Sequence, residues 1–589
     1  MIDLTRRSAT ALAAAVNQRE TSAEAVMAET LARIEAYDVV QPQIWIARTA
    51  PEALIARAQA IDARVAAGER LPLAGVPFAV KDNIDVAGLA TTAACPAFAY
   101  EPAQSATVVA RLEAAGAICV GKTNLDQFAT GLVGTRSPFG IPRNASNLAY
   151  VSGGSSSGSS IAVAAGLVPF ALGTDTAGSG RVPAAFNHLI GFKPTKGRWS
   201  TAGLVPACRT IDCISVFTDD TADARLIDGI VAGYDAADPW SKPLADRAIG
   251  RKTIGVPRRD QRLWFGDAES EFLYDGALDV LAGLADVVEI DFAPLKEAAQ
   301  LLYGGPWVAE RTAALSALLA DNPEAIDPTV REVVSPGLDV GAVDLFKGIY
   351  RLAELKREAD AQWQQIDALA FPTTGTAYRV NELLAAPVAL NSNLGAYTNF
   401  VNLLDMAALA VPAGQRANAT GFGVTFIGPA DSDRALLDLA DAYLAAANLP
   451  PPPPLDLEGK MQTVKLAVVG AHLKDMPLHW QLTSREATFV EATTTAPSYK
   501  LYAMADSVPP KPALVHAEDG AAIAVEIYEL DVAAFGSFTV EVPAPLAIGT
   551  VTLADGSSVK GFVAEPRAIV GAEDITALGG WRAYVARGA

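Results

Sequence analysis

The amino-acid sequence predicts an α/β domain with a mixed central sheet flanked by helices, followed by a smaller, mostly β domain. Two observations support this fold class. Between residues 73 and 217, short apolar segments alternate with Gly-rich turns and helical stretches. Beyond a run of five prolines at 450–454, the chain consists mainly of short alternating apolar and polar segments. We therefore expect an α/β domain over 1–447, a proline-rich linker over 448–463 and a β-rich domain over 464–589.

The predicted elements follow the chain in order. Helical spacing of apolar residues marks the N-terminal ~70 residues and a long middle region, whereas short apolar runs bounded by Gly or Pro predict strands. Five consecutive prolines can neither continue a helix nor join a central strand, so they predict an extended spacer. The expected helices are 22–37, 52–68, a helical middle over 268–365, and 431–449; the expected strands are 76–80, 116–121, 168–173, 367–373, 422–428, 463–473, 498–505, 522–530, 537–542 and 549–556.

Composition limits the class of function. The chain has 589 residues and a formal net charge of −20, which disfavours nucleic acid and anionic lipid as partners. An anionic substrate would therefore need a local cationic clamp. The four cysteines are too scattered for a disulfide or zinc framework, and neither a metal site nor a phosphate-binding loop is recognisable. The longest apolar run, 161–172, is too short to span a bilayer, and we expect a cytoplasmic protein without a signal peptide.

The serine-rich segment 152–160, SGGSSSGSS, is the most unusual stretch. Gly/Ser-rich sequence is commonly a flexible linker, but this run passes directly into the apolar segment IAVAAGLVPFALG. A tight turn that holds serines at a site is therefore favoured. GSSSG also fits the G-x-S-x-G nucleophile elbow, which requires an acid and then a histidine downstream. His188 follows too closely and the other three histidines lie beyond the prolines, so the base must be another residue.

Lysine can act as a base when burial beside hydroxyl groups lowers its pKa. Lys81 ends the apolar run AGVPFAV, which places its side chain at a strand terminus. The alternative for Lys81 is a solvated lysine at a strand end. A second Gly-rich segment, GTDTAGSGR at 173–181, contains Ser179. Small residues before this serine allow several backbone N–H groups to converge on an oxyanion, which predicts an oxyanion hole formed by Thr176, Ala177, Gly178 and Ser179.

Taken together, Lys81, the GGSS loop and the segment GTDTAGSGRVP resemble the amidase signature family over residues 20–445. The segments GKTNLDQFATG at 121–131 and GFKPTKGRWSTAGLVP at 191–206 are also similar to that family. Ala177 and Gly180 depart from the family pattern but keep small residues beside the serine. The resemblance implies that Ser179 is the nucleophile, that Ser155 bridges it to Lys81, and that Lys81 is a neutral base.

Three further features resemble the members of this family that hydrolyse allophanate (urea-1-carboxylate). The segment FATGLVGTRSPFG at 128–140 places Gly131 in the substrate site. The segment LYGGPWVAERTAAL at 302–315 carries Tyr303 and Arg311, whose spacing predicts one face of a helix and a clamp for a small carboxylate. The C-terminal domain, with GAHL at 470–473, resembles the domain that follows the amidase in these enzymes, similar in fold to γ-glutamylcyclotransferases.

The resemblance implies hydrolysis of the terminal amide of allophanate to ammonia and N-carboxycarbamate, without a cofactor, by a homodimer that depends on a separate urea carboxylase. His472 is the candidate for decarboxylation in the C-terminal domain, although a structural or assembly role for that domain stays open. Two other functions also stay open. One is a different amidase or a glutamine amidotransferase subunit, and the other is an inactive scaffold, which intact Lys81, Ser155 and Ser179 argue against.

Overall fold

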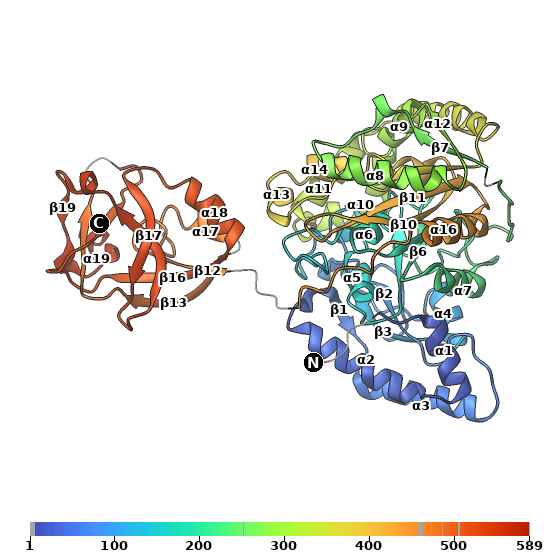
Figure 1. The fold of residues 1–589 in the computed structure, drawn as a ribbon, viewed down its shortest axis with the longest axis horizontal. Coiled ribbons are helices and arrows are strands. Elements are labelled where there is room, and N and C mark those ends of the chain that lie inside the picture. The colour runs from blue at the N-terminus through green and yellow to red at the C-terminus, as the bar shows by residue number, and fades with distance from the viewer. Residues whose placement is uncertain (1–5, 251, 458–462, 486, 505–506, 588–589) are drawn as a thin grey trace. The chain divides into compact units, whose positions relative to one another are not determined.

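The computed structural model describes residues 6–250, 252–457, 463–485, 487–504 and 507–587. The chain divides into two compact units, Met1–Leu457 and Glu458–Ala589 (Figure 1). The boundary falls inside the segment 448–463, of which residues 458–462 lie outside the described part. The predicted fold class, an α/β domain followed by a smaller β-rich domain, is confirmed.

A mixed sheet of 11 strands forms the centre of the first unit, in the order β1-β3-β2-β4-β6-β5-β10-β11-β9-β7-β8. Strand β2 is parallel to both β3 and β4, so the carboxyl ends of these three strands meet at one edge of the sheet. The strands are β1 Trp45–Arg48, β2 Pro77–Lys81, β3 Ile118–Thr123, β4 Phe170–Asp175, β5 Ile190–Lys193, β6 Cys213–Thr218, β7 Thr253–Pro257, β8 Asp286–Ile290, β9 Ala368–Pro372, β10 Met406–Gln415 and β11 Gly421–Pro429.

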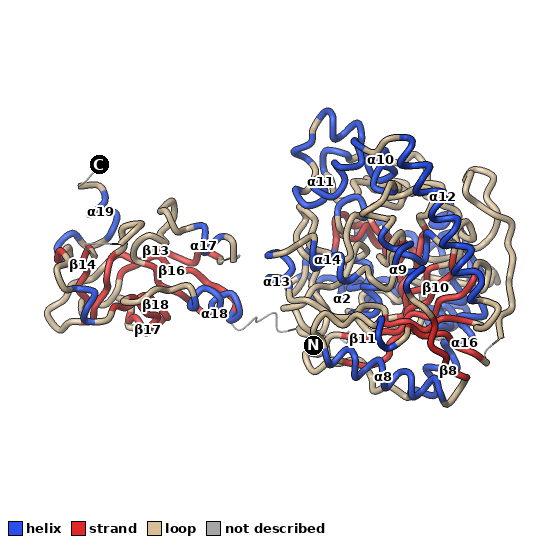
Figure 2. Tube along the Cα trace, turned by 90° about the horizontal axis from the view of Figure 1, so that it is seen from above, coloured by secondary structure: helices blue, strands red, loops and turns tan. Residues whose placement is uncertain are grey.

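Helices lie on both sides of this sheet (Figures 1 and 2). Helix α5 is buried along its whole length, because its residues are small or apolar and it packs against β2, β3, β4 and β6. The helices are α1 Ala9–Gln18, α2 Ala23–Asp38, α3 Pro51–Ala66, α4 Thr107–Ala114, α5 Ser157–Ala164, α6 Val182–Phe186, α7 Thr221–Val231, α8 Ala268–Ala282, α9 Ala293–Gln300, α10 Trp307–Asp321, α11 Pro328–Val334, α12 Ala342–Gln362, α13 Val380–Ala385, α14 Ala389–Leu394, α15 Phe400–Leu403 and α16 Asp433–Ala447.

The middle of the chain differs from the predicted helical stretch in one respect. The run of β-branched residues at 286–290 forms the edge strand β8 and pairs in parallel with β7. This pairing supplies the hydrogen bonds that a helix would otherwise make within itself. Proline and glycine residues divide the remaining stretch into α9, α10, α11 and α12.

The second unit contains a five-stranded sheet in the order β13-β16-β12-β18-β17 and a three-stranded sheet in the order β15-β14-β19. The expected strand at 537–542 is wrong: most of it belongs to helix α18, which buries Phe538 in the core. The elements are β12 Thr463–Val468, α17 Trp480–Thr483, β13 Thr488–Thr494, β14 Tyr499–Ala503, β15 Pro512–His516, β16 Ala524–Asp531, α18 Val532–Val540, β17 Leu546–Thr552, β18 Ser558–Ala564, β19 Glu573–Asp574 and α19 Trp581–Val585. No helix in the described ranges is long and apolar enough to cross a membrane.

Candidate active site

Lys81 is completely buried at the carboxyl end of β2. Its Nζ lies 2.7 Å from Oγ of Ser155 and 2.7 Å from Oγ1 of Thr174. Burial lowers the pKa of Lys81 to about 7, although the carboxylates of Asp126, Asp212 and Asp175 act in the opposite direction. Because hydroxyl groups carry no charge to compensate an ammonium ion, Lys81 can lose its proton near neutral pH.

The serine-rich segment is part of the core, which excludes a flexible linker. All residues of 152–160 are buried, and the segment leads directly into α5. The peptide bond between Gly154 and Ser155 is cis. A side chain at Gly154 would clash with Oδ2 of Asp126, so only glycine fits there. The backbone carbonyl of Ser155 accepts a hydrogen bond from the amide of Asp126 at 3.1 Å. These contacts fix Ser155 beside Lys81.

The loop after β4 is held by the carboxylate of Asp175. This group accepts the amide N–H groups of Gly178 at 2.8 Å and Gly180 at 3.1 Å. It also receives two hydrogen bonds from the guanidinium of Arg181, at 2.8 and 2.9 Å. Burial alone would raise the pKa of Asp175, but Arg181 holds that pKa below its usual range. The loop that carries Ser179 is therefore fixed by a charged carboxylate.

Ser179 is 2% exposed, and its hydroxyl donates to the carbonyl of Gly131 at 3.4 Å. The hydrogen bonds of the described residues do not include one between Ser179 and Ser155. Of the four amides predicted for the oxyanion hole, that of Gly178 is occupied by Asp175. The backbone N–H groups of Thr176, Ala177 and Ser179 have no hydrogen-bond partner in the described part of the chain. Three donors are thus left to face an oxyanion.

Arg311 is a buried cation with incomplete hydrogen bonding. Its Nη1 donates to Oγ1 of Thr130 at 3.2 Å, whereas Nε and Nη2 have no partner among the described residues. Its guanidinium carbon lies 4.9 Å from the centre of the Tyr303 ring. Leaving two buried charged donors unpaired is costly, and a bound carboxylate would satisfy both at once.

The positions of Tyr303 and Arg311 correct one prediction. Arg311 lies in α10, but Tyr303 lies in the turn between α9 and α10 rather than on the same helix. The reason is Pro306, which caps α10 and follows two glycines. Tyr303 nevertheless covers Arg311 because the turn folds back over the helix start.

A cavity of about 810 Å³ adjoins this pair. It is bordered by α9, by Tyr303 and by the segment 391–399. The same segment contacts the site, since the side-chain oxygen of Asn391 accepts the amide of Leu132, next to Gly131. The cavity therefore lies on the Tyr303 side of the candidate site.

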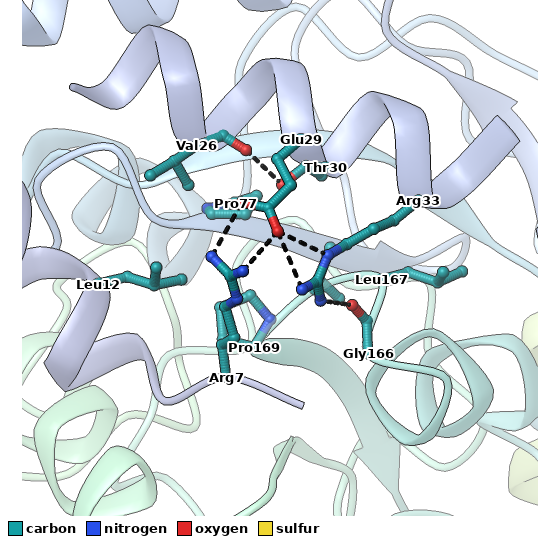
Figure 3. A pocket seen from close by; sticks show the side chains of 11 residues that line it. Arg7, Leu12, Val26, Glu29, Thr30, Arg33, Pro77, Gly166, Leu167 and Pro169 are labelled. Atoms are coloured by element: carbon teal, nitrogen blue, oxygen red, sulfur yellow. Dashed lines mark hydrogen bonds and ion pairs between the residues drawn. The ribbon is translucent and has the colours of Figure 1, made fainter. Parts of the chain in front are cut away.

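A much smaller cavity, of about 20 Å³, lies at the opposite edge of the sheet. It is bordered by Pro77, where β2 begins, and by Pro169, which precedes β4. Figure 3 shows Arg7 and Arg33 directed at Glu29 beside it. Its volume suffices for about one water molecule. This cavity has no part in the chemistry at the other ends of these strands.

His472 lies in the turn after β12, in the second unit. Its ring stacks on Phe562 at 5.0 Å and meets Phe538 edge-on at 5.1 Å. Its Nε2 lies 2.7 Å from the side-chain oxygen of Gln481. Burial lowers the pKa of His472, which favours the neutral imidazole. His188, in the first unit, is buried as expected for a packed residue, and burial lowers its pKa to about 4.

Sequence reasoning missed two groups that contact the predicted residues. Thr174 supplies the second hydroxyl at Lys81, and Asp212 binds the hydroxyl of Thr176 at 2.5 Å. Thr174 precedes the Asp175 of the segment that identified Ser179, so its position could have been noticed. Asp212 has no comparable local signal, because it lies 36 residues beyond Thr176. In the described ranges, no three His, Cys, Asp or Glu side chains converge to hold a metal ion.

Comparison with known proteins gives a match in each unit. The amidase family model matches residues 25–437, which is well over half of the chain. The model of the allophanate hydrolase C-terminal domain matches residues 464–586.

Individual relatives match one or both units. The urea amidolyase of Saccharomyces cerevisiae is 44% identical over 570 residues, which cover 92% of this chain but 31% of that protein. The chain thus spans about a third of the length of this relative. The glutamyl-tRNA(Gln) amidotransferase of Deinococcus deserti has one subunit that is 34% identical, over 74% of this chain and 95% of its own. The structure of Kluyveromyces lactis allophanate hydrolase superposes with a TM-score of 0.71 at 40% identity, covering 97% of this chain and 98% of its own.

Proposed function

The chain belongs to the amidase family and is an amide (C–N) hydrolase, and from this premise we propose that its substrate is allophanate. The reaction is hydrolysis of the terminal amide, which releases ammonia and N-carboxycarbamate. Breakdown of the second product gives further ammonia and carbon dioxide. The family match of residues 464–586 to the C-terminal domain of allophanate hydrolases supports this substrate over glutamine.

The buried guanidinium of Arg311 is the observation that carries the proposal. Its unpaired Nε and Nη2 lie in the plane of the group and suit a carboxylate that binds with both oxygens. Allophanate is a small planar amide with one carboxylate. Binding that carboxylate under Tyr303 would complete the hydrogen bonds of Arg311 and supply the cationic clamp that a chain of net charge −20 requires.

In the first half of the reaction, Oγ of Ser179 attacks the carbonyl carbon of the terminal amide. The proton of Ser179 passes to Ser155, whose own proton passes to the neutral Nζ of Lys81, 2.7 Å away. The carbonyl oxygen becomes an oxyanion, which the free amides of Thr176, Ala177 and Ser179 are positioned to stabilise. The C–N bond then breaks, and Lys81 returns its proton through Ser155 to the departing nitrogen. Ammonia leaves, and Ser179 carries the acyl group.

The second half repeats these steps with water. Ser155 and neutral Lys81 take a proton from water as its oxygen attacks the acyl carbon. The bond to Ser179 breaks, and the proton returns to the Ser179 oxygen. The released product is N-carboxycarbamate. A Lys81 pKa of about 7 suits both directions of transfer, because its two protonation states are then close in free energy.

For the C-terminal unit we propose that the neutral ring of His472 assists loss of carbon dioxide from this product. Carbamates also decompose unaided, so His472→Asn should leave ammonia release from the terminal amide unchanged and slow only later steps. Allophanate must be supplied by a reaction that carboxylates urea, which we assign to a separate urea carboxylase. The assembly we propose is a cytoplasmic homodimer, for which a measured mass of one chain in solution is the contrary result.

Ammonia release from allophanate by the purified chain tests the function. Ser179→Ala should abolish it. Arg311→Gln should weaken binding and raise the KM for allophanate by about 10- to 150-fold, the value of hydrogen bonds to a charged group. Biuret is the matched control, because an amide replaces its carboxylate and its turnover should not depend on Arg311. Turnover of glutamine or malonamate without turnover of allophanate would contradict the proposed substrate but leave Ser179 as nucleophile.

A further inference from the structure

Asp212 is a buried carboxylate immediately before β6 that contacts the nucleophile loop. Its Oδ1 accepts the hydroxyl of Thr176 at 2.5 Å. Its Oδ2 accepts the amides of Ala207 at 2.8 Å and Cys208 at 3.1 Å. No cation forms an ion pair with Asp212 in the described ranges. The two amides therefore anchor the carboxylate in its own turn, while its remaining oxygen holds Thr176.

Thr176 is the first residue after β4, and its amide is one of the three free donors of the candidate oxyanion hole. The loop is thus held at two places. Asp175 binds its far part through Gly178 and Gly180, and Asp212 binds its beginning through Thr176. Release of Thr176 would leave the direction of its amide, and that of the following Ala177, without a side-chain restraint.

Asp212 also acts on the base through its charge. Its carboxylate favours the protonated form of Lys81, while the cation of Arg311 disfavours it. Burial raises the pKa of Asp212 to about 6. The carboxyl borders a cavity of about 210 Å³, which gives it a route for proton exchange. The titratable and charged groups that face it are Lys81, Arg311, Cys208, Cys213, Arg209 and Asp238.

We propose that Asp212 is a positioning residue for amide hydrolysis, which holds Thr176 so that the loop amides converge on the oxyanion and whose charge sets the pH at which Lys81 becomes a base. This inference rests on the proposed function and adds a residue to it. Asp212 contacts neither substrate nor Ser179, so it acts through Thr176 and Lys81.

Two variants separate the two actions. Thr176→Val removes the hydroxyl but keeps the charge, so kcat should fall about tenfold or more, less than the 10²–10³-fold for loss of an oxyanion donor itself. Asp212→Asn removes both, so kcat should fall similarly. In addition, the acid limb of its kcat/KM profile should move to lower pH, because neutral Lys81 then persists to lower pH. Thr176→Ser, which keeps the hydroxyl, should restore kcat.

Asp433 provides the matched control, because it is buried and accepts the amide and hydroxyl of Thr195 at 2.7 and 2.6 Å. Asp433→Asn should lower the melting temperature without moving the acid limb. Equal limbs in wild type and Asp212→Asn, or full activity in Thr176→Val, would overturn the inference. If allophanate is not turned over but another amide is, the same variants are compared on that amide. Failure of the substrate proposal is then distinguishable from failure of the role of Asp212.

Discussion

Lys81 and Lys122 are both completely buried on adjacent parallel strands, and they differ in their partners. Nζ of Lys122 lies 3.0 Å from a carboxylate oxygen of Asp82 and donates to the hydroxyl of Thr91 at 3.0 Å. Nζ of Lys81 has two hydroxyl oxygens as neighbours, each at 2.7 Å, and no carboxylate of the described part of the chain lies within ion-pair distance of it.

The difference shows how one sheet edge can hold a structural cation beside a catalytic base. Burial penalises the charge of both lysines, and a direct carboxylate partner offsets that penalty for Lys122 alone. Lys81 lacks this partner, so burial lowers its pKa to about 7. The neighbours of each amine, rather than its depth in the fold, decide whether it can act as a base.

The largest expected effect comes from Lys81→Met, which keeps the length of the side chain and removes the amine. The kcat for ammonia release should fall about 10²–10⁴-fold, the usual contribution of general acid–base transfer. The fold should persist, since the variant removes a buried polar group without leaving a charge unpaired. Steady-state kinetics and thermal unfolding of the same preparation measure both effects.

The pH dependence sharpens this prediction. Wild-type kcat/KM should rise with pH through about 7, because the neutral amine is the active form. The pKa of Lys81 is lower in the folded chain than its ordinary value of 10.5, so the unfolded chain binds more protons between these two values. Wild-type stability should therefore rise over that window, and the advantage of Lys81→Met in melting temperature should grow as pH falls from 10.5 to 7. A constant difference would mean that Lys81 stays charged in the fold.

The opposite experiment is Lys122→Met, which leaves Asp82 as a buried charge without its cation. The free energy of unfolding should fall by about 3–5 kcal/mol, as when one partner of a buried pair is removed. Turnover per folded molecule should change far less than in Lys81→Met. Urea denaturation followed by circular dichroism gives the first quantity, and activity normalised to folded protein gives the second.

The double variant Lys122→Met/Asp82→Asn tests whether the loss comes from the unpaired charge. It should recover a substantial part of the stability lost in the single variant, since contacting residues are not additive. Equal stability of the single and double variants would contradict the ion-pair explanation and reduce the comparison with Lys81 to one of packing.

The sequence predicted the fold class and located the parts of the site that depend on local motifs. Lys81 was found because an apolar strand ends at it, and Ser155 and Ser179 because glycines surround them, since close backbone approach restricts those positions. Their catalytic roles stay predictions. The contact of Tyr303 with Arg311 was predicted from the wrong element, because helical spacing continues through a segment that Pro306 interrupts.

Contacts between distant parts of the chain could not be predicted. Lys122 belongs to a recognisable segment, but only the sheet register brings its side chain to Asp82, 40 residues earlier in the sequence. An aspartate before a strand, such as Asp212, is equally compatible with a solvated loop. The use of the Gly178 amide by Asp175 is likewise set by the folded loop, and the Gly-rich pattern alone does not reveal which amides stay free.

The smallest expected effect separates the two lysines at the level of one hydroxyl. Thr174→Val removes a partner of Lys81, and Thr91→Val removes the corresponding partner of Lys122. Each loses one buried hydrogen bond, worth about 0.5–1.5 kcal/mol, so their melting temperatures should fall by similar amounts.

Only Thr174→Val should also change the chemistry. Its kcat should fall by up to about tenfold, because the hydroxyl of Thr174 orients the Lys81 amine toward Ser155. Thr91→Val should keep kcat within about twofold, since Lys122 retains Asp82 and has no proton to transfer. Equal loss of kcat in both variants would mean that each threonine acts through the stability of the sheet edge. In that case the hydroxyl environment would not be what makes Lys81 a base, and burial alone would have to account for it.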